Sequence, residues 1–223
     1  MQNEVLWKQN VISQQEKKHE NLFAPHNKVF ISGIIEKDFE FCHEFLFELF
    51  YKTRIRTIRL SDTEDYVPIV VSELLINNKK EKGQAEGKYA EVTGEFRSHN
   101  KRDKEGRSHL ELFLFVSSIK IYESMDEMEE KMNLNSICLE GYVCKNPDYR
   151  VTYSKKEVTD IIIAVRRQHS KSDYIPCIAW GRTAVWTSYL KVGDKVKLYG
   201  RIQSREYFKR KPETFDLEKG ELR

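Results

Sequence analysis

Residues 173–179 read Asp-Tyr-Ile-Pro-Cys-Ile-Ala and residues 65–71 read Asp-Tyr-Val-Pro-Ile-Val-Val, so one strand-like pattern occurs twice in the chain. Two further pairs of segments match in the same order: Asn27-Lys-Val-Phe-Ile-Ser-Gly33 with Asn135-Ser-Ile-Cys-Leu-Glu-Gly141, and Val92-Thr-Gly-Glu-Phe-Arg97 with Leu198-Tyr-Gly-Arg-Ile-Gln203. Three matching blocks in one order indicate a tandem duplication of one small β domain.

The second copy predicts five strands with a helix after the third. The expected strands are Ser136 to Cys144, Tyr149 to Arg167 with a break near Ser154, Asp173 to Ala179, Lys195 to Ser204, and Thr214 to Glu218. Between the third and fourth, residues 182–190 place apolar side chains at helical spacing. This order of elements is that of the OB-fold, a five-stranded Greek-key barrel. We therefore predict an all-β protein with two tandem OB-folds.

The first copy departs from the second in its middle. Aromatic and polar residues alternate from Phe39 to Tyr51, which predicts a half-buried second strand. Lys52 to Glu64 then reads as an extra stretch that lengthens the connection to the third strand, and the helix shrinks to about Ser72 to Ile76. The first copy is thus the more diverged of the two.

A chain of 223 residues has room for two domains of about 100 residues each. We expect an N-terminal arm or short helix at 1–25, a diverged OB-fold at 26–122, an acidic linker at 123–133 and a second OB-fold at 134–223. The linker assignment rests on the run Glu123-Ser-Met-Asp-Glu-Met-Glu-Glu130, which is charged and lies between two apolar-patterned regions.

Composition excludes several classes of protein. No window approaches the run of about 18 apolar residues that a membrane span needs, and residues 1–10 do not form a secretory signal. The four cysteines stand singly with no CxxC pair, which argues against a zinc site and a disulfide framework. No HExxH, P-loop, GxGxxG or GxSxG motif occurs. We expect a cytoplasmic protein that is not an enzyme, with no cofactor, metal or small-molecule substrate.

Charge is distributed unevenly along the chain. Residues 135–223 hold 18 Lys and Arg against 11 Asp and Glu, a balance of +7, whereas residues 1–134 hold 20 against 24, a balance of −4. A basic half favours a polyanionic partner, because cations that neutralise phosphates release counterions. A merely solvated surface explains the same excess equally well.

The second copy resembles the bacterial single-stranded DNA-binding protein family. The segments that carry the resemblance are Asn135-x-Ile-x-Leu-x-Gly141, Asn146-Pro-Asp148 with Arg150, Ile163-Ala-Val165, Tyr174-Ile-Pro-Cys-Ile-Ala-Trp-Gly-Arg182, Tyr189-Leu-Lys-Val-Gly193 and Val196-x-Leu-x-Gly200. The resemblance implies sequence-independent binding of single-stranded DNA in replication, repair or recombination. It further implies a nucleoid-associated protein of the bacterial cytoplasm and a homodimer that gathers four OB-folds.

Two departures from the family leave alternatives open. The sequence shows no Gly/Pro-rich tail with an acidic tip, and the first copy has Ser72 where the second has Trp180. They support an OB-fold module for protein interaction, such as a replication or primosome accessory, with DNA binding weak or lost. RNA binding by the same fold also stays open, since it differs only in recognition of the 2′-hydroxyl and the bases.

Aromatic side chains supply the candidate stacking surface. Tyr174 and Trp180 match family positions at which aromatic rings stack on bases, and their even spacing on one strand places both on one face. Tyr207 and Phe208 lie among cations in the loop before the fifth strand, which favours binding over packing. Trp186 lies on the expected helix, and we expect it to pack against the end of the barrel.

Basic residues supply the candidate phosphate contacts. In the second copy these are Arg166, Arg167, Lys155, Lys156, Arg182, Lys209 and Arg210. In the first copy, Tyr66 matches Tyr174. Three arginines there could extend the path of the bound DNA strand: Arg54, Arg56 and Arg59.

Overall fold

The computed structural model describes residues 26–59, 61–76, 83–103, 105–123, 134–167, 171–204, 215–216 and 221–222. Its strands are β1 (Asn27–Ile35), β2 (Glu40–Phe45), β3 (Glu48–Ile58), β4 (Glu64–Ser72), β5 (Tyr89–Arg102), β6 (Ser108–Tyr122), β7 (Asn135–Val143), β8 (Asp148–Val151), β9 (Glu157–Arg166), β10 (Ser172–Trp180), β11 (Lys195–Gly200), β12 (Phe215–Asp216) and β13 (Glu221–Leu222). Within these ranges the helices are η2 (Glu73–Leu75) and α2 (Arg182–Thr187), and neither is long and apolar enough to cross a membrane. The predicted all-β OB-fold architecture is confirmed.

Strands β1 to β6 close into a barrel, which we call the first unit. β1 pairs antiparallel with β3 on one side and with β5 on the other, and β4 pairs parallel with β6. The barrel closes tightly at Gly33, because a Cβ there would lie 2.1 Å from the carbonyl oxygen of Arg56. A larger residue would force β1 and β3 apart, which explains the glycine that ends the first matched block.

The second strand of the first unit differs from its prediction. Instead of one strand from Phe39 to Tyr51, β2 and β3 form a hairpin that turns at Leu46 and Phe47. Residues 52–58, predicted as part of an extra connection, continue β3 and pair along β4. Thr53, Ile55 and Thr57 are buried on the inner face, and the arginines between them face outward. The alternation of inward and outward side chains therefore continues along β3. It was not visible in the sequence because the outward positions are arginines.

The second unit consists of β7 to β11 with α2. β7 pairs with β11 and β9, and β9 pairs with β10 and β8. The predicted helix is shorter than expected, since α2 ends at Thr187. The predicted fifth strand at 214–218 is wrong: residues 215–216 pair with 221–222 in a separate two-stranded sheet. Among the described residues, no strand therefore occupies the place that β6 holds in the first unit.

Side-chain burial shows the effect of that difference. In the first unit β6 pairs alongside Ile69 and Val92, which are 0% and 2% exposed. Their repeat counterparts in the second unit, Cys177 and Leu198, pack against the core but are less completely buried. The backbone agrees, because a Cβ on Gly94 would lie 2.1 Å from the Phe115 carbonyl oxygen of β6, whereas one on Gly200 would have its nearest neighbour at 4.0 Å. Among the residues that the structure describes, nothing therefore closes the second barrel on this side.

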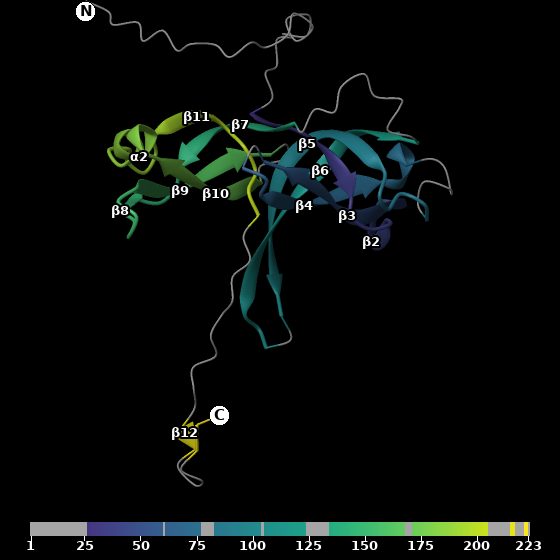
Figure 1. Cartoon of the computed structure of the whole chain (residues 1–223), viewed down its shortest axis with the longest axis horizontal. Helices are drawn as coiled ribbons and strands as arrows, with labels where there is room; N and C mark the ends of the chain where they lie inside the picture. Colours follow the sequence, from purple (N-terminus) through teal and green to yellow (C-terminus); the bar gives the residue numbers. More distant parts are fainter. Residues whose placement is uncertain are drawn as a thin grey trace, which may run out of the picture.

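The two units share one continuous sheet. β1 pairs antiparallel with β7, with Val29 opposite Ile137. The first strand of one repeat thus pairs with the first strand of the other repeat (Figure 1). The asparagine that opens each repeat has the same task in both. The Asn27 side chain exchanges two hydrogen bonds with the backbone of Phe96, and Asn135 does so with Ile202. The arm at 1–25 and most of the acidic linker lie outside the described residues, so the domain boundaries stay predictions.

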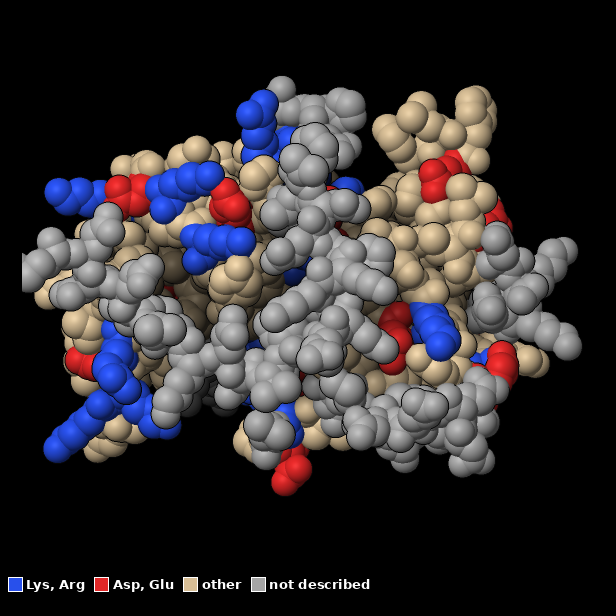
Figure 2. Space-filling view, turned by 90° about the horizontal axis from the view of Figure 1, so that it is seen from above, with Lys and Arg blue, Asp and Glu red and all other residues tan. Residues whose placement is uncertain are grey.

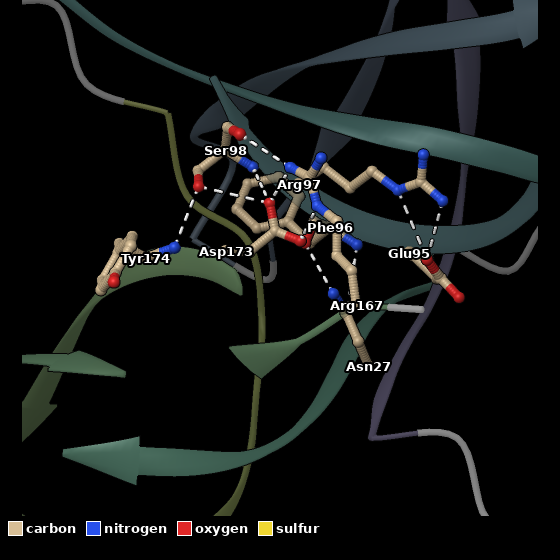
Figure 3. Close-up of polar contacts among 8 residues, drawn as sticks. All are labelled: Asn27, Glu95, Phe96, Arg97, Ser98, Arg167, Asp173 and Tyr174. Carbon is tan, nitrogen blue, oxygen red and sulfur yellow. Dashed lines mark hydrogen bonds and ion pairs between the residues drawn. The ribbon is translucent and has the colours of Figure 1, made fainter. Parts of the chain in front are cut away.

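A reciprocal pair of polar contacts fixes the units against each other. Asp173 at the start of β10 accepts hydrogen bonds from Ser98 of the first unit, and Asp65 at the start of β4 accepts them from Ser204 of the second. Each carboxylate is also held by an arginine of its own unit. Asp173 pairs with Arg167 (Figure 3), and Asp65 pairs with Arg59. The duplicated Asp-Tyr segments therefore hold the two repeats together.

Candidate nucleic-acid interface

The outer face of β10 presents the two aromatic residues of the matched segment. Burial alternates along the strand, with Ile175 inside at 2% exposed. Tyr174 and Trp180 lie on the other face and are 51% and 44% exposed. The structure thus brings both rings to one face of the sheet, and the inward residues of the same strand fill the barrel.

A row of residues extends this face across the sheet. Tyr174 on β10 lies opposite Ala164 on β9, which lies opposite Tyr142 on β7. Tyr142 in turn lies opposite Lys195 on β11. Directly paired residues point to the same side of a sheet, so two tyrosines and a lysine share the row, with a small alanine between the rings. Tyr142 and Tyr199 are about half and three-quarters exposed, and neither was identified as a site residue from the sequence. The alternating pattern around Tyr142, which has a buried residue on either side, could have indicated that its ring faces outward.

Cations on β11 border the aromatic row. Lys195 pairs with Glu140 at 2.6 Å, and the hydrogen bond to that carboxylate raises the pKa of Lys195. The Lys197 ammonium lies 5.5 Å from the centre of the Tyr199 ring, and its hydrogen bond to Tyr199 raises the pKa of Lys197. Figure 2 shows Lys and Arg gathered over the end of the molecule formed by the second unit. Both ammonium groups thus remain charged at neutral pH.

An open hollow lies beside Trp180 at one end of β10. Its lining residues are Val151, Lys155, Lys156, Glu157, Trp180 and Gly181. The two lysines belong to the tight turn between β8 and β9, in which Lys155 has a φ of 57° and its backbone N–H donates to the Thr152 carbonyl. The turn therefore holds two exposed cations beside an exposed indole, which is the combination of charge and ring that a nucleotide requires.

The neighbouring residues Arg166 and Arg167 have different surroundings. Arg166 is exposed at the end of β9, and it forms no ion pair with another described residue. Arg167 instead forms a double ion pair with Asp173 and donates to the Ser98 carbonyl oxygen at 2.8 Å (Figure 3). The hydrogen bond to Asp173 raises the pKa of Arg167. We predicted both as phosphate contacts, but Arg167 is committed to the junction between the units.

The remaining candidate site residues of the second unit lie away from the aromatic row or outside the described residues. Arg182 is exposed at the first residue of α2, beside the hollow residue Gly181. Trp186 does not pack against the barrel as expected, since it is 64% exposed on α2. Tyr207, Phe208, Lys209 and Arg210 lie outside the described residues, and their role stays a prediction.

The matching face of the first unit has its charges paired. Arg54 pairs with Glu36, Arg56 with Glu64, and Arg59 with the buried Asp65. The Tyr66 hydroxyl donates to Glu64 at 2.5 Å, and this bond raises the pKa of Tyr66. Ser72, at the position of Trp180, is buried and caps η2 by accepting from the Leu74 N–H. Among the described residues, this face of the first unit therefore has no exposed indole, and its three arginines are all paired with carboxylates.

Residues 134–216 match the single-strand binding protein family. The chain is also 35% identical over 80 residues to single-stranded DNA-binding protein B of Bacillus subtilis, a match that covers 33% of this chain and 71% of that protein. The chain belongs to the single-strand binding protein family. Another member of this single-strand binding family, the single-stranded DNA-binding protein of Oceanobacillus iheyensis, is 36% identical over 81 residues, which span 33% of this chain and 50% of the relative.

A solved structure extends the likeness of fold to both units. The wild-type single-stranded DNA binding protein from Thermus aquaticus superposes with a TM-score of 0.64 at 19% identity, covering 86% of this chain and 98% of that one. At this identity the match concerns the fold alone. Since the match covers far more than the second unit, both barrels of the chain follow the OB architecture.

Proposed function

We propose that the chain binds single-stranded DNA without sequence choice through the outer face of its second unit. One observation carries the proposal: Tyr142, Tyr174 and Trp180 are all about half exposed on a single sheet face. Aromatic faces stack on bases of any sequence, at about 1–3 kcal/mol per base. The family membership of the chain, and the names of the relatives that share it, support the same function.

Phosphates would lie against the exposed cations that border this face. We assign that role to Arg166, Lys155, Lys156 and Arg182, with Lys197 at the far edge. Arg167, Arg54, Arg56 and Arg59 are excluded from it because each already pairs with a carboxylate. Tyr66, whose hydroxyl is bound to Glu64, is excluded with them. The DNA path therefore runs over the second unit.

The finer points of the function follow from the same family. We propose a role in replication, repair or recombination in the bacterial cytoplasm, at the nucleoid, without enzymatic activity. A homodimer would bring together four OB-folds, two of them with an aromatic face. The division of labour between units, with DNA on the second and protein contacts on the first, rests on the paired charges of the first-unit face.

A competition assay tests the proposal. The full chain is bound to a fluorescent oligo-dT strand, and unlabelled single-stranded DNA, duplex DNA and RNA of equal length compete for it. We expect single-stranded DNA to displace the probe at much lower concentration than duplex, because stacking needs unpaired bases. Equal competition by duplex DNA would show that charge alone holds the strand, and failure to bind oligo-dT would leave the protein-interaction function.

A further inference from the structure

The tip of the β2–β3 hairpin in the first unit exposes large apolar side chains to solvent. Leu46 and Phe47 form the two-residue turn and are 78% and 97% exposed, while Phe41 and Phe45 on β2 are 58% and 63% exposed. The turn residues have φ values of 49° and 64°, the left-handed region that such turns normally fill with Asn and Gly. A bulky pair in this conformation costs stability, and within the described residues both side chains stay largely exposed.

The charge around the tip excludes DNA as its partner. Residues 38–51 contain Asp38, Glu40, Glu44 and Glu48 but no Lys or Arg, and the next cation along the hairpin, Lys52, pairs with Glu40. A phosphate backbone would be repelled by these carboxylates. An apolar tip surrounded by acids instead fits a surface that combines exposed rings or aliphatic groups with unpaired cations.

The second unit carries a surface of that chemistry at the corresponding hairpin. The turn between β8 and β9 is basic where the β2–β3 turn is acidic, and the hollow beside it is lined by Val151, Lys155, Lys156 and Trp180. Figure 1 shows β2 and β8 at opposite ends of the molecule, so the tip of a chain does not reach its own hollow. Only another copy can bring the two together.

We propose that the β2–β3 tip of one copy docks in the Trp180 hollow of a second copy, with Phe47 against the indole and Glu44 beside the lysines. The tip would imitate a nucleotide, because its rings replace bases and its carboxylates replace phosphates. Docking and DNA binding then compete for one surface. This inference rests on the proposed function, and it adds that the protein covers its own binding face when DNA is absent.

The test uses the double variant Leu46→Asn/Phe47→Gly, which removes the apolar tip and installs the residue pair that the turn favours. Sedimentation velocity of the full chain is measured over a range of concentrations at low salt, with and without oligo-dT. We expect the variant to self-associate at least about tenfold more weakly than the original chain and to melt at the same or a higher temperature. Oligo-dT should reduce association of the original chain to the level of the variant.

A charge exchange provides the matched control. Glu44→Lys and Lys156→Glu should each weaken association alone, and a mixture of the two variants should associate again. The inference is overturned if the original chain does not self-associate, if the turn variant associates as well as the original, or if oligo-dT changes nothing. Oligo-dT binding by dilute turn variant tests the proposed function separately, since that variant leaves Trp180 and its cations in place.

Discussion

Ser204 and Asp65 lie 139 residues apart, and the Ser204 backbone N–H donates to the Asp65 carboxylate at 2.8 Å. The same bond recurs with the units exchanged, from Ser98 to Asp173. Burial acts to raise the pKa of Asp65, but hydrogen bonds from Arg59 and the Ser204 N–H outweigh it and hold the pKa below its ordinary value of 3.8. The junction is therefore held by two carboxylates, and Asp65 in particular must stay ionised.

This predicts a loss of stability in acid. A depressed pKa in the folded state means that the stabilisation by Asp65 is complete above pH 3.8 and is lost as pH falls through the folded value. Asp65→Asn, which leaves Arg59 without a charged partner, should cost about 3 kcal/mol at neutral pH. Urea unfolding at several pH values checks this, and the variant should show a shallower decline below pH 4 than the original chain. Parallel declines in the two proteins would contradict the assignment.

Replacing Arg166 should affect DNA binding, whereas replacing its neighbour Arg167 should affect stability. Arg166→Gln should reduce the slope of log affinity for oligo-dT against log salt by about 0.7, the value for one phosphate on a single strand, without changing thermal stability. Arg167→Gln should lower the melting temperature, because it leaves the buried Asp173 without its ion pair. Salt titrations and thermal melts of both variants check the pair. Equal salt slopes for Arg166→Gln and the original chain would remove Arg166 from the path.

The indole on β10 should contribute to binding and the one on α2 should not. Trp180→Ala is expected to weaken oligo-dT binding by about 1–3 kcal/mol, the worth of one stacked base. Trp186→Ala serves as the matched control, since Trp186 is also exposed but lies on α2 rather than on the outer face of β10. Fluorescence titrations compare the two. Similar losses in both would mean that the strand follows a different path.

Substituting the glycines at equivalent positions of the two repeats tests whether the second barrel is open. Gly94→Ala should destabilise the chain by about 1–3 kcal/mol, because its Cβ would collide with the Phe115 carbonyl of β6. Gly200→Ala at the repeat position has its nearest contact at 4.0 Å and should be tolerated. Thermal melts distinguish them. A large loss for Gly200→Ala would indicate that another strand closes the second barrel there.

Much of the fold could be predicted because the chain contains a repeat, so a strand pattern found in one copy supports the same strand in the other. The Asn and Asp-Tyr segments align the repeats, and the structure gives both copies the same partners. β3 was missed beyond Tyr51 because outward arginines interrupt its apolar pattern. The closing strand at 214–218 was predicted by analogy with a complete barrel, whereas its pairing depends on contacts far along the chain.

The candidate site was only partly visible in the sequence. The spacing of Tyr174 and Trp180 predicted a shared face, since that depends on one strand alone. The position of Tyr142 beside them depends on the register between β7 and β9, which no local pattern shows. Likewise, nothing local separates Arg166 from Arg167, because the partners of Arg167 come from β10 and from the other unit.

Because β1 and β7 belong to a single polypeptide, their pairing holds at any dilution. In an assembly of identical chains, each substitution is imposed on every copy of the barrel at once. Here the Ser72 position and the Trp180 position can change independently. The linked arrangement thus allows one half to carry Ser72 and an acidic, aromatic hairpin while the other carries Trp180, so that two different surfaces occur in one chain.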